Sequence, residues 1–259
     1  MSVPADDRGL LLGDGLFETV LFRAGEPVLW DAHLARLERG CDALALPRPK
    51  RAVLEAEAAR ALADEGLNDS RAAVRLTWTG GSAGRGLNRP AAPVPRLLVA
   101  AAASERPSTD AVVVSASVRR NAASPSARLK SLSYLDNVLA RMQATAAGAD
   151  EALMLNTDGR LACAAAANLF WLQAGVLLTP APQTGRMDGV MARQVIVAAA
   201  AQDLEVRQVR AGVEALEGAE AIFLTSSLIG IRPAGLVGRA PPAPSPVVER
   251  LASAVSRFV

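Results

Sequence analysis

The second half of the chain carries strand-like segments that lie too close together for helical crossovers. The apolar runs 168–172 and 176–179 are three residues apart, and similar runs occupy 152–155 and 221–224. Neighbouring antiparallel strands can be joined by a tight turn, whereas parallel strands need a connection of about a dozen residues or more. With helices interspersed, this spacing favours the α+β class with mixed or partly antiparallel sheets.

The remaining segments predict a chain of two domains. Alternating or apolar runs predict further strands at 15–22, 71–78, 95–103 and 111–118, and apolar residues at helical spacing predict helices at 30–45, 52–64, 133–147, 189–201 and 246–258. The polar, proline-containing segment 105–110 is typical of a linker. We therefore expect a smaller N-terminal α/β domain at 1–104 and a larger C-terminal domain at 111–259.

The composition is that of an enzyme-sized globular protein. Of 259 residues, 51% are hydrophobic and 21% are charged, and the formal net charge of +2 is too small to suggest a nucleic-acid partner. No apolar run reaches the roughly 20 residues that cross a bilayer, so no membrane partner is expected. Cys41 and Cys163 lack the spacing of a metal site, and in a chain without an N-terminal signal segment they indicate a reducing compartment, the cytoplasm.

Lysine is scarce in this chain. Lys50 and Lys130 are the only two lysines, beside 26 arginines. A primary amine can form an imine with an aldehyde, whereas the guanidinium of arginine stays protonated and is not a nucleophile. Lys50 lies in a proline-punctuated turn that is typical of the surface. Lys130 lies between a loop and a predicted helix, where it is either a surface lysine or a reactive amine.

Three segments could bind a phosphate group. The glycine-containing turn 185–189 precedes a predicted helix, whose first N–H groups favour an anion. The hydroxyls of Thr225, Ser226 and Ser227 follow a predicted strand, and Arg36 lies among apolar residues of the first predicted helix. Each feature is also ordinary, as a turn, a cap or a solvent-facing arginine.

Several motifs together resemble the fold-type IV pyridoxal phosphate (PLP) enzymes, which include branched-chain and D-amino acid aminotransferases and 4-amino-4-deoxychorismate lyase. The resemblance begins with segment 7–19 (DRGLLLGDGLFET) and segment 33–37 (HLARL), and it continues with the lysine-containing segment 129–140 (LKSLSYLDNVLA). Shorter matches follow in the family's order, at 150–153, 167–171, 179–180, 189–191 and 225–233. The resemblance therefore covers nearly the whole chain.

The resemblance implies a two-domain fold like that of D-amino acid aminotransferase, with a small-molecule substrate, one PLP per chain and a homodimeric assembly. Lys130 would hold the cofactor as an imine and later move protons at the reacting carbon. Arg36 would bind the cofactor phosphate, together with the amides of Val190 and Met191 and the hydroxyl of Ser227. The three phosphate signals would then belong to one site.

Further roles follow from the same resemblance. Tyr134, four residues after Lys130, would reach the cofactor's phenolic oxygen from the same helical turn, or it is simply a half-buried helix residue. Thr19 occupies the place where the lyases carry a threonine thought to assist proton transfer, although a threonine is also common in strands. Arg85, in the glycine-rich loop, would bind a substrate carboxylate or is a solvated loop residue.

The sequence departs from the family pattern at three points. Cys163 stands where the family has a glutamate that holds a proton on the pyridine nitrogen, and a neutral thiol cannot stabilise a pyridinium in this way. Ser133 replaces the usual asparagine of the lysine motif, and the N-terminal strand of relatives is missing. Transamination should suffer more from the cysteine than an elimination that is driven by aromatisation.

Three interpretations therefore remain open. The first is a lyase that converts aminodeoxychorismate to 4-aminobenzoate and pyruvate in folate biosynthesis. The second is an aminotransferase of the same fold, of the branched-chain or D-amino acid type. The third is a catalytically impaired, non-enzymatic relative, because Cys163 replaces the glutamate.

Overall fold

The computed structural model describes residues 3–239 and 243–259, which form two compact units. The first unit comprises Met1–Glu105 and Leu129–Ser133, and the second comprises Arg106–Arg128 and Tyr134–Val259. Residues 1–2 and 240–242, which belong to the two predicted domains, lie outside the described residues. None of the helices described within these ranges has the length and apolarity that crossing a bilayer requires.

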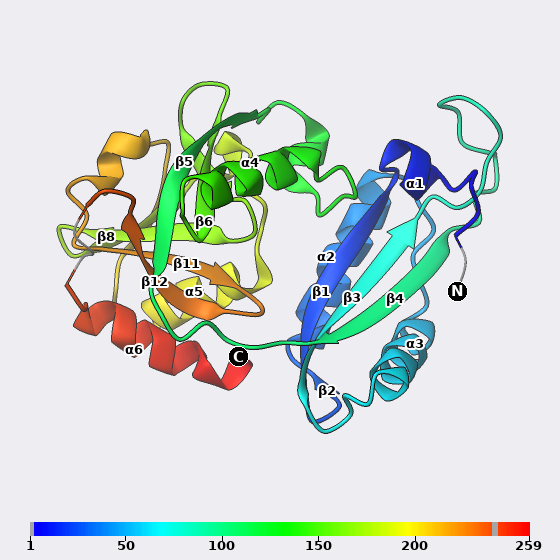
Figure 1. Cartoon of the computed structure of the whole chain (residues 1–259), viewed down its shortest axis with the longest axis horizontal. Helices are drawn as coiled ribbons and strands as arrows, with labels where there is room; N and C mark the ends of the chain where they lie inside the picture. The colour runs from blue at the N-terminus through cyan, green and yellow to red at the C-terminus, as the bar shows by residue number, and fades with distance from the viewer. Residues whose placement is uncertain (1–2, 240–242) are drawn as a thin grey trace. The chain divides into compact units, whose positions relative to one another are not determined.

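The first unit contains a four-stranded antiparallel sheet, with helices packed against it (Figure 1). The strand order is β2-β1-β3-β4. Its strands are β1 (Gly15–Arg23), β2 (Glu26–Pro27), β3 (Arg71–Thr79) and β4 (Arg96–Ala103), and its helices are α1 (Arg8–Leu12), α2 (Trp30–Ala43) and α3 (Arg51–Asp64).

Alternation along the strands decides which side chains enter the core of the first unit. Leu16, Val20 and Phe22 on β1 pack in one cluster with Leu34, Leu37 and Cys41 of α2 and with Leu54, Ala58 and Leu62 of α3. Successive side chains of a strand point to opposite faces, so Phe17 and Thr19 lie on the face away from these helices. Glu18 shares the helix-facing side with the apolar residues and is completely buried.

Segment Leu129–Ser133 belongs to the first unit although it lies in the second half of the sequence. It runs along the edge of β1: the amide of Phe17 donates to the carbonyl of Lys130 at 2.9 Å, and the amide of Leu132 donates to the carbonyl of Gly15 at 3.0 Å. The backbone of Lys130 is therefore not helical. The prediction that Lys130 and Tyr134 share a helical turn is wrong, because these strand-like hydrogen bonds keep the segment out of helix α4 (Leu135–Ala146), whose N-cap is Tyr134.

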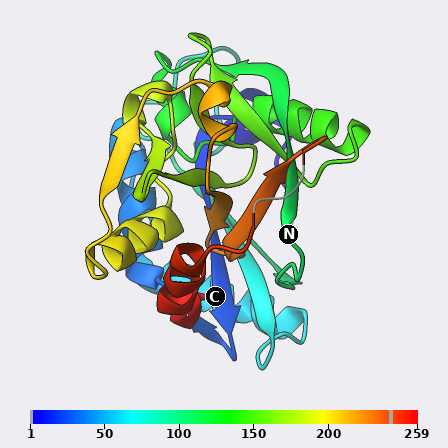
Figure 2. The ribbon, with the colours of Figure 1, turned by 90° about the vertical axis from the view of Figure 1, so that its left-hand side faces the viewer.

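The second unit contains an eight-stranded mixed sheet of order β10-β9-β8-β11-β12-β5-β6-β7. In chain order its strands are β5 (Ala111–Arg120), β6 (Glu151–Asn156), β7 (Leu161–Ala164), β8 (Asn168–Gln173), β9 (Val176–Pro180), β10 (Val206–Val209), β11 (Ala221–Ser226) and β12 (Gly230–Leu236). Besides α4, its helices are α5 (Val190–Ala200) and α6 (Pro246–Val255), which lie side by side in both views (Figure 2). The mixed and antiparallel sheets confirm the predicted α+β class.

Every strand and helix predicted from the sequence is present, with ends that differ by a few residues. Among the α-helices and strands of the described residues, those that the sequence did not predict are short or poor in the residues that such elements prefer: α1, β2, β7, β10 and β12. Strand β12 reads GIRPAGL, and its glycines and proline disfavour a strand on propensity alone. Tertiary pairing with β11 and β5 overrides that preference.

Candidate active site

The first unit surrounds the amine of Lys130 with an aromatic ring and cations. Its Nζ lies 4.3 Å from the centroid of the Phe17 ring, and the guanidinium carbon of Arg75 lies 3.7 Å from the same centroid. Burial is the main cause that lowers the pKa of Lys130 from 10.5 to about 8. The charges of Arg36 and Arg75 act in the same direction, while that of Glu18 opposes them. A substantial fraction of this amine is therefore neutral near physiological pH, as a nucleophile requires.

Glu18 binds two side chains of helix α2. Arg36 donates from Nε to Oε1 of Glu18 at 2.7 Å and from Nη2 to Oε2 at 2.5 Å, and His33 Nδ1 lies 2.7 Å from Oε2. Burial pushes the pKa of Glu18 upward, but the charge of Arg36 and the hydrogen bonds from Arg36 and His33 outweigh it and hold that pKa at about 2. Glu18 is thus ionised and accepts only.

The charge state of Glu18 fixes the tautomer of His33. Burial lowers the pKa of His33 below 6.5, so its ring is neutral, although Glu18 acts in the opposite direction. Because an ionised carboxylate can only accept, Nδ1 carries the proton and donates it to Glu18. Residues 33 and 36 are three apart on α2, which brings both side chains to the same carboxylate.

Arg36 is predicted from the sequence to bind a phosphate. In the structure its guanidinium forms a bidentate ion pair with the carboxylate of Glu18. Among the charges that act on the pKa of Lys130 are two cations, Arg36 and Arg75, and one carboxylate, Glu18, so positive charge is in excess around this amine. Such an excess of positive charge suits a phosphate ester. The phosphate role of Arg36 remains a prediction.

Thr19 and Arg85 differ in their burial: Thr19 is half-buried in a strand and Arg85 is exposed in a loop. Thr19 is half-buried on β1, directly opposite Arg75 of β3 and on the sheet face that Phe17 shares. Arg85 is exposed, and it makes no hydrogen bond or ion pair with any residue in the described ranges 3–239 and 243–259. Their catalytic and substrate-binding roles remain predictions.

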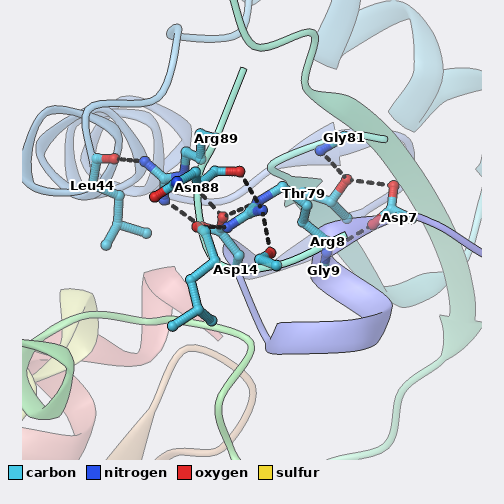
Figure 3. Close-up of polar contacts among 11 residues, drawn as sticks. Asp7, Arg8, Gly9, Asp14, Leu44, Thr79, Gly81, Asn88 and Arg89 are labelled. Atoms are coloured by element: carbon cyan, nitrogen blue, oxygen red, sulfur yellow. Dashed lines mark hydrogen bonds and ion pairs between the residues drawn. The ribbon is translucent and has the colours of Figure 1, made fainter. Parts of the chain in front are cut away.

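The loop that carries Arg85 is fixed by neighbouring residues around Asp14 (Figure 3). Arg8 donates from Nε to Asp14 at 2.7 Å and from Nη2 to the carbonyl of Leu87 at 2.8 Å. Arg89 donates from Nε to the same carboxylate at 2.8 Å and also binds the carbonyl of Leu44. Burial resists ionisation of Asp14, but the hydrogen bond from Arg89 dominates and the pKa of Asp14 is lowered. The side chain of Arg85 is thus exposed, while hydrogen bonds from Arg8 and Arg89 hold the loop that carries it.

The second unit presents an uncapped helix beginning next to buried polar groups. Helix α5 begins at Val190, and its N-cap Gly189 has no side chain that could bond the first amides. A Cβ at Gly189 would lie 1.9 Å from Oδ1 of Asn168, so any larger residue there would displace Asn168 or the start of α5. Asn168 is held in place by donating from Nδ2 to the carbonyl of Met187 at 2.9 Å. The amides of Val190 and Met191 therefore lie at the positive end of the helix dipole, as the phosphate prediction requires.

The hydroxyl residues Thr225 and Ser227 lie at the end of β11 and in the turn after it. Thr225 pairs in register with Asn168 and is fully buried, and its Oγ1 has no hydrogen-bond partner within the described part of the chain. Ser227 is half-buried in the turn after β11. A buried hydroxyl without a partner is costly, so this end of the unit suits a ligand with acceptor oxygens. The residues present therefore fit a phosphorylated cofactor.

Cys163 lies in β7 opposite Met154 of β6 and is buried. Burial raises the pKa of the Cys163 thiol, and the nearby charge of Glu151 acts in the same direction, while Arg120 and Arg186 oppose it. The thiol is therefore neutral at physiological pH. Tyr134, at the start of α4, is half-buried. The cofactor contacts of Cys163, Tyr134 and Ser227 remain predictions.

Sequence reasoning missed several residues that the structure brings into these clusters. Glu18 and Arg75 act on the charge of Lys130, and His33 binds Glu18. One signal was available for Glu18: it is a carboxylate on the apolar side of an alternating strand, between Leu16 and Val20. Arg75 gave no such signal, because its neighbours are assembled only by strand pairing.

Comparison with known proteins identifies the class. The sequence model of the family described as "Amino-transferase class IV" matches residues 15–237, and the chain belongs to this family. It is a PLP-dependent enzyme, and a solved PLP-bound structure of a hypothetical aminotransferase from Mycobacterium tuberculosis is 25% identical, covers 100% of this chain and 93% of that chain, and has a TM-score of 0.85. The interpretation as a non-enzymatic relative is therefore wrong.

Within the family, lyases and aminotransferases are both similar to this chain. The aminodeoxychorismate lyase of Bacillus subtilis is 32% identical over 88% of this chain and 78% of its own length. The crystal structure of a putative 4-amino-4-deoxychorismate lyase from Legionella pneumophila is 27% identical, covers 100% of this chain and 96% of that chain, and has a TM-score of 0.91. A putative branched-chain aminotransferase of Methanocaldococcus jannaschii is 30% identical over 88% of this chain and 80% of its own length.

Proposed function

We propose that the protein is an aminodeoxychorismate lyase, which forms 4-aminobenzoate and pyruvate from 4-amino-4-deoxychorismate for folate biosynthesis. Two observations carry this proposal: the pKa of the Lys130 amine is lowered to about 8, and Cys163, which the resemblance aligns with a glutamate of the family, is a neutral thiol. Similarity to the Bacillus and Legionella proteins named above supports the same reaction. The thiol favours an elimination over a transamination, because the latter depends more on a protonated pyridine nitrogen.

When bound, PLP supplies an aldehyde for the amino group of the substrate and a ring that withdraws electrons from the carbon bearing it. Lys130 would hold the aldehyde. Arg36, the amides of Val190 and Met191 and the hydroxyl of Ser227 would hold the phosphate, with Tyr134 near the phenolic oxygen.

Lys130 would also act as the base that removes a proton from the substrate. Its pKa of about 8 lets the amine accept a proton near neutral pH and return it readily. In the proposed reaction the amine removes the proton from the amine-bearing ring carbon, and the bond from the ring to the enolpyruvyl oxygen breaks. The electron pair of the C–H bond completes the aromatic ring, and the enolpyruvate leaves and tautomerises to pyruvate. No oxidant or reductant is needed.

Two further side chains would act on the substrate. Thr19 lies on the same sheet face as Phe17, whose ring contacts the Lys130 amine, and it would assist the transfer of the proton. Arg85 would bind one of the two substrate carboxylates, since a guanidinium matches a carboxylate with two parallel hydrogen bonds. The substitution Arg85→Met should therefore raise KM much more than it lowers kcat.

The direct test is to incubate the PLP-loaded protein with aminodeoxychorismate and to assay pyruvate and 4-aminobenzoate. We expect both products in equal amounts, and none from Lys130→Ala. Absence of both products from protein that retains its bound cofactor would rule out the lyase.

An aminotransferase is the second candidate, favoured by similarity to the Methanocaldococcus protein. The two functions differ in what happens to the cofactor in one half-reaction. An amino donor would convert the PLP of an aminotransferase to its amine form, and this changes the visible absorption spectrum. A lyase leaves the spectrum unchanged at the end of turnover.

The proposed assembly is a homodimer in the cytoplasm, without a nucleic-acid or membrane partner. Cys41 and Cys163 are both buried, unbridged thiols, which is the usual state in a reducing compartment. Leu135, Val138, Leu139 and Met142 form an exposed apolar stripe on α4, which supports the dimer.

A further inference from the structure

Arg186 is a buried cation on which the charge of Asp188 acts, but it forms no hydrogen bond or ion pair within the described part of the chain. Its exposed fraction is 7%, and its Nε has no hydrogen-bond partner within the described part of the chain. No carboxylate in residues 3–239 or 243–259 forms an ion pair with this guanidinium. Burying an unpaired charge is expensive unless a ligand later supplies the missing acceptor. We therefore expect the guanidinium of Arg186 to donate a hydrogen bond to an acceptor atom of a bound ligand.

The backbone fixes where Arg186 lies. The preceding Gly185 has a φ of +85°, which L side chains rarely adopt, and a Cβ there would lie 3.0 Å from Cα of Ala122. Arg120 is buried as well, and it donates from Nε to the carbonyl of Gly185 at 2.7 Å and from Nη2 to the carbonyl of Ala127. The turn that leads into Arg186 is thus held by a second buried guanidinium.

Arg186 and Arg120 both act electrostatically on Cys163. The acid that also acts on this thiol is Glu151, which is already engaged: its Oε2 accepts from Arg141 at 2.7 Å and its Oε1 from the amide of Ala152 at 2.9 Å. Among the described residues, the charges that act on the Cys163 thiol are therefore two cations and one carboxylate, Glu151, which is already paired. A ring nitrogen placed here would meet donors rather than an acceptor.

We propose that Arg186 donates a hydrogen bond to the pyridine nitrogen of bound PLP and keeps that nitrogen unprotonated. This inference rests on the proposed placement of the cofactor ring beside Cys163, and it does not depend on which substrate the enzyme uses. A nearby cation disfavours protonation of a base, and an unprotonated nitrogen accepts the hydrogen bond that Nε of Arg186 lacks. Cys163 places a neutral thiol where a carboxylate would otherwise stabilise a proton on the pyridine nitrogen.

The chemical consequence is a weaker electron sink. A ring with an unprotonated nitrogen stabilises a carbanion less, so transamination is slowed. An elimination in which the departing electrons complete an aromatic ring depends less on that sink. Arg186 and Cys163 together would then be the specificity-determining pair of this chain.

The protonation state can be measured without turnover by nitrogen-15 NMR of protein loaded with PLP that is labelled at the pyridine nitrogen. In the wild type we expect the chemical shift of an unprotonated nitrogen throughout the neutral pH range. In Arg186→Met the pKa of this nitrogen should rise by about one unit or more, because a buried like charge is removed. In the double variant Cys163→Glu, Arg186→Met the nitrogen should be protonated at neutral pH.

Arg207→Met is the matched control. Arg207 lies on β10, where it is exposed and paired with Glu205, so this variant should keep the wild-type nitrogen titration. Far-UV circular dichroism and the visible absorption of the bound cofactor establish that each variant is folded and loaded.

A protonated nitrogen in the wild type at neutral pH would overturn the proposal. So would an Arg186→Met variant that keeps the wild-type nitrogen titration but binds substrate more weakly, since Arg186 would then serve a substrate carboxylate. Failure of the lyase assay alone would leave the NMR result standing, so the two proposals fail separately.

Discussion

Glu18 is the residue on which the charge balance around Lys130 depends. Its carboxylate raises the pKa of the Lys130 amine, and it is bound by both Arg36 and His33. Removing one member of a buried ion pair leaves the other charge uncompensated and costs about 3–5 kcal/mol. Compared with two well-packed hydrophobic residues in the same place, the intact pair contributes little net stability, so what it adds is the fixed placement of Arg36 and of the charge that acts on Lys130.

The first prediction concerns the substitution Glu18→Gln. We expect it to lower the free energy of unfolding at neutral pH by about 3 kcal/mol, because Arg36 keeps its charge and loses its counter-ion. Urea unfolding followed by circular dichroism measures this change. Asp42→Asn is the matched control: it breaks a bidentate ion pair with Arg48 that is exposed, so it should change stability little.

The pH dependence of stability gives a second readout of the same variant. The pKa of Glu18 is lowered from 4.5 to about 2 on folding, so its stabilisation is complete above pH 4.5 and is lost as the pH falls toward 2. The difference in stability between wild type and Glu18→Gln should therefore shrink with acidification in this window. A difference that stays constant down to the lower end of the window would contradict the ionised state of Glu18.

At the scale of elements, the Asp14 cluster shows how a loop is held without secondary structure. Segment 80–95 contains no helix and only an isolated bridge at Ser82, yet Arg8 and Arg89 connect it to Asp14, and Arg89 also binds the carbonyl of Leu44, the C-cap residue of α2. The substitution Asp14→Asn should therefore increase hydrogen exchange of the amides of this loop by at least about tenfold, which corresponds to roughly 1.4 kcal/mol of local opening. Arg85→Met should leave the exchange unchanged, since Arg85 has no contact that holds the loop. Equal protection in Asp14→Asn and wild type would show that the cluster does not anchor the loop.

The start of α5 allows a test of the proposed phosphate site. In Gly189→Ala the new Cβ would meet Oδ1 of Asn168 at 1.9 Å, so Asn168 or the first turn of α5 must shift. We expect the affinity for PLP to fall about tenfold or more, because the helix amides would no longer be aligned on the phosphate. Equilibrium dialysis with PLP measures this, and Gly218→Ala is the control because its Cβ would meet only Nε2 of Gln173 at 3.8 Å. Unchanged affinity in Gly189→Ala would argue against phosphate binding at this helix.

The sequence predicts most elements because their patterns are local. Alternation along β1 and apolar spacing along α2 are visible within a dozen residues, and both elements are present. Strand β12 and the strand-like Leu129–Ser133 segment are different, because their backbone hydrogen bonds go to strands that are remote in sequence. For the same reason Lys130 could be singled out by its rarity, whereas the contribution of Arg75 to its pKa could not.

At the scale of the whole molecule, helix α4 carries an apolar stripe that the chain itself leaves exposed. Leu135, Val138, Leu139 and Met142 follow the spacing of one helical face and are 68%, 50%, 41% and 61% exposed. The opposite face packs into the second unit through Asn137, Ala140 and Ala144. An apolar face of a helix is normally buried, so this stripe is well suited to a protein interface.

We expect the double substitution Val138→Glu, Met142→Glu to convert the proposed homodimer to a monomer. Two carboxylates in the centre of an apolar interface would have to be desolvated without a counter-ion, which outweighs the remaining contacts. Light scattering coupled to size-exclusion chromatography should report half of the wild-type mass at the same protein concentration. Val197→Glu is the control: Val197 is 63% exposed on α5, away from the stripe, and its replacement should keep the dimer mass. A wild type that is already monomeric, or a double variant that remains dimeric, would show that copies of this chain do not associate through α4.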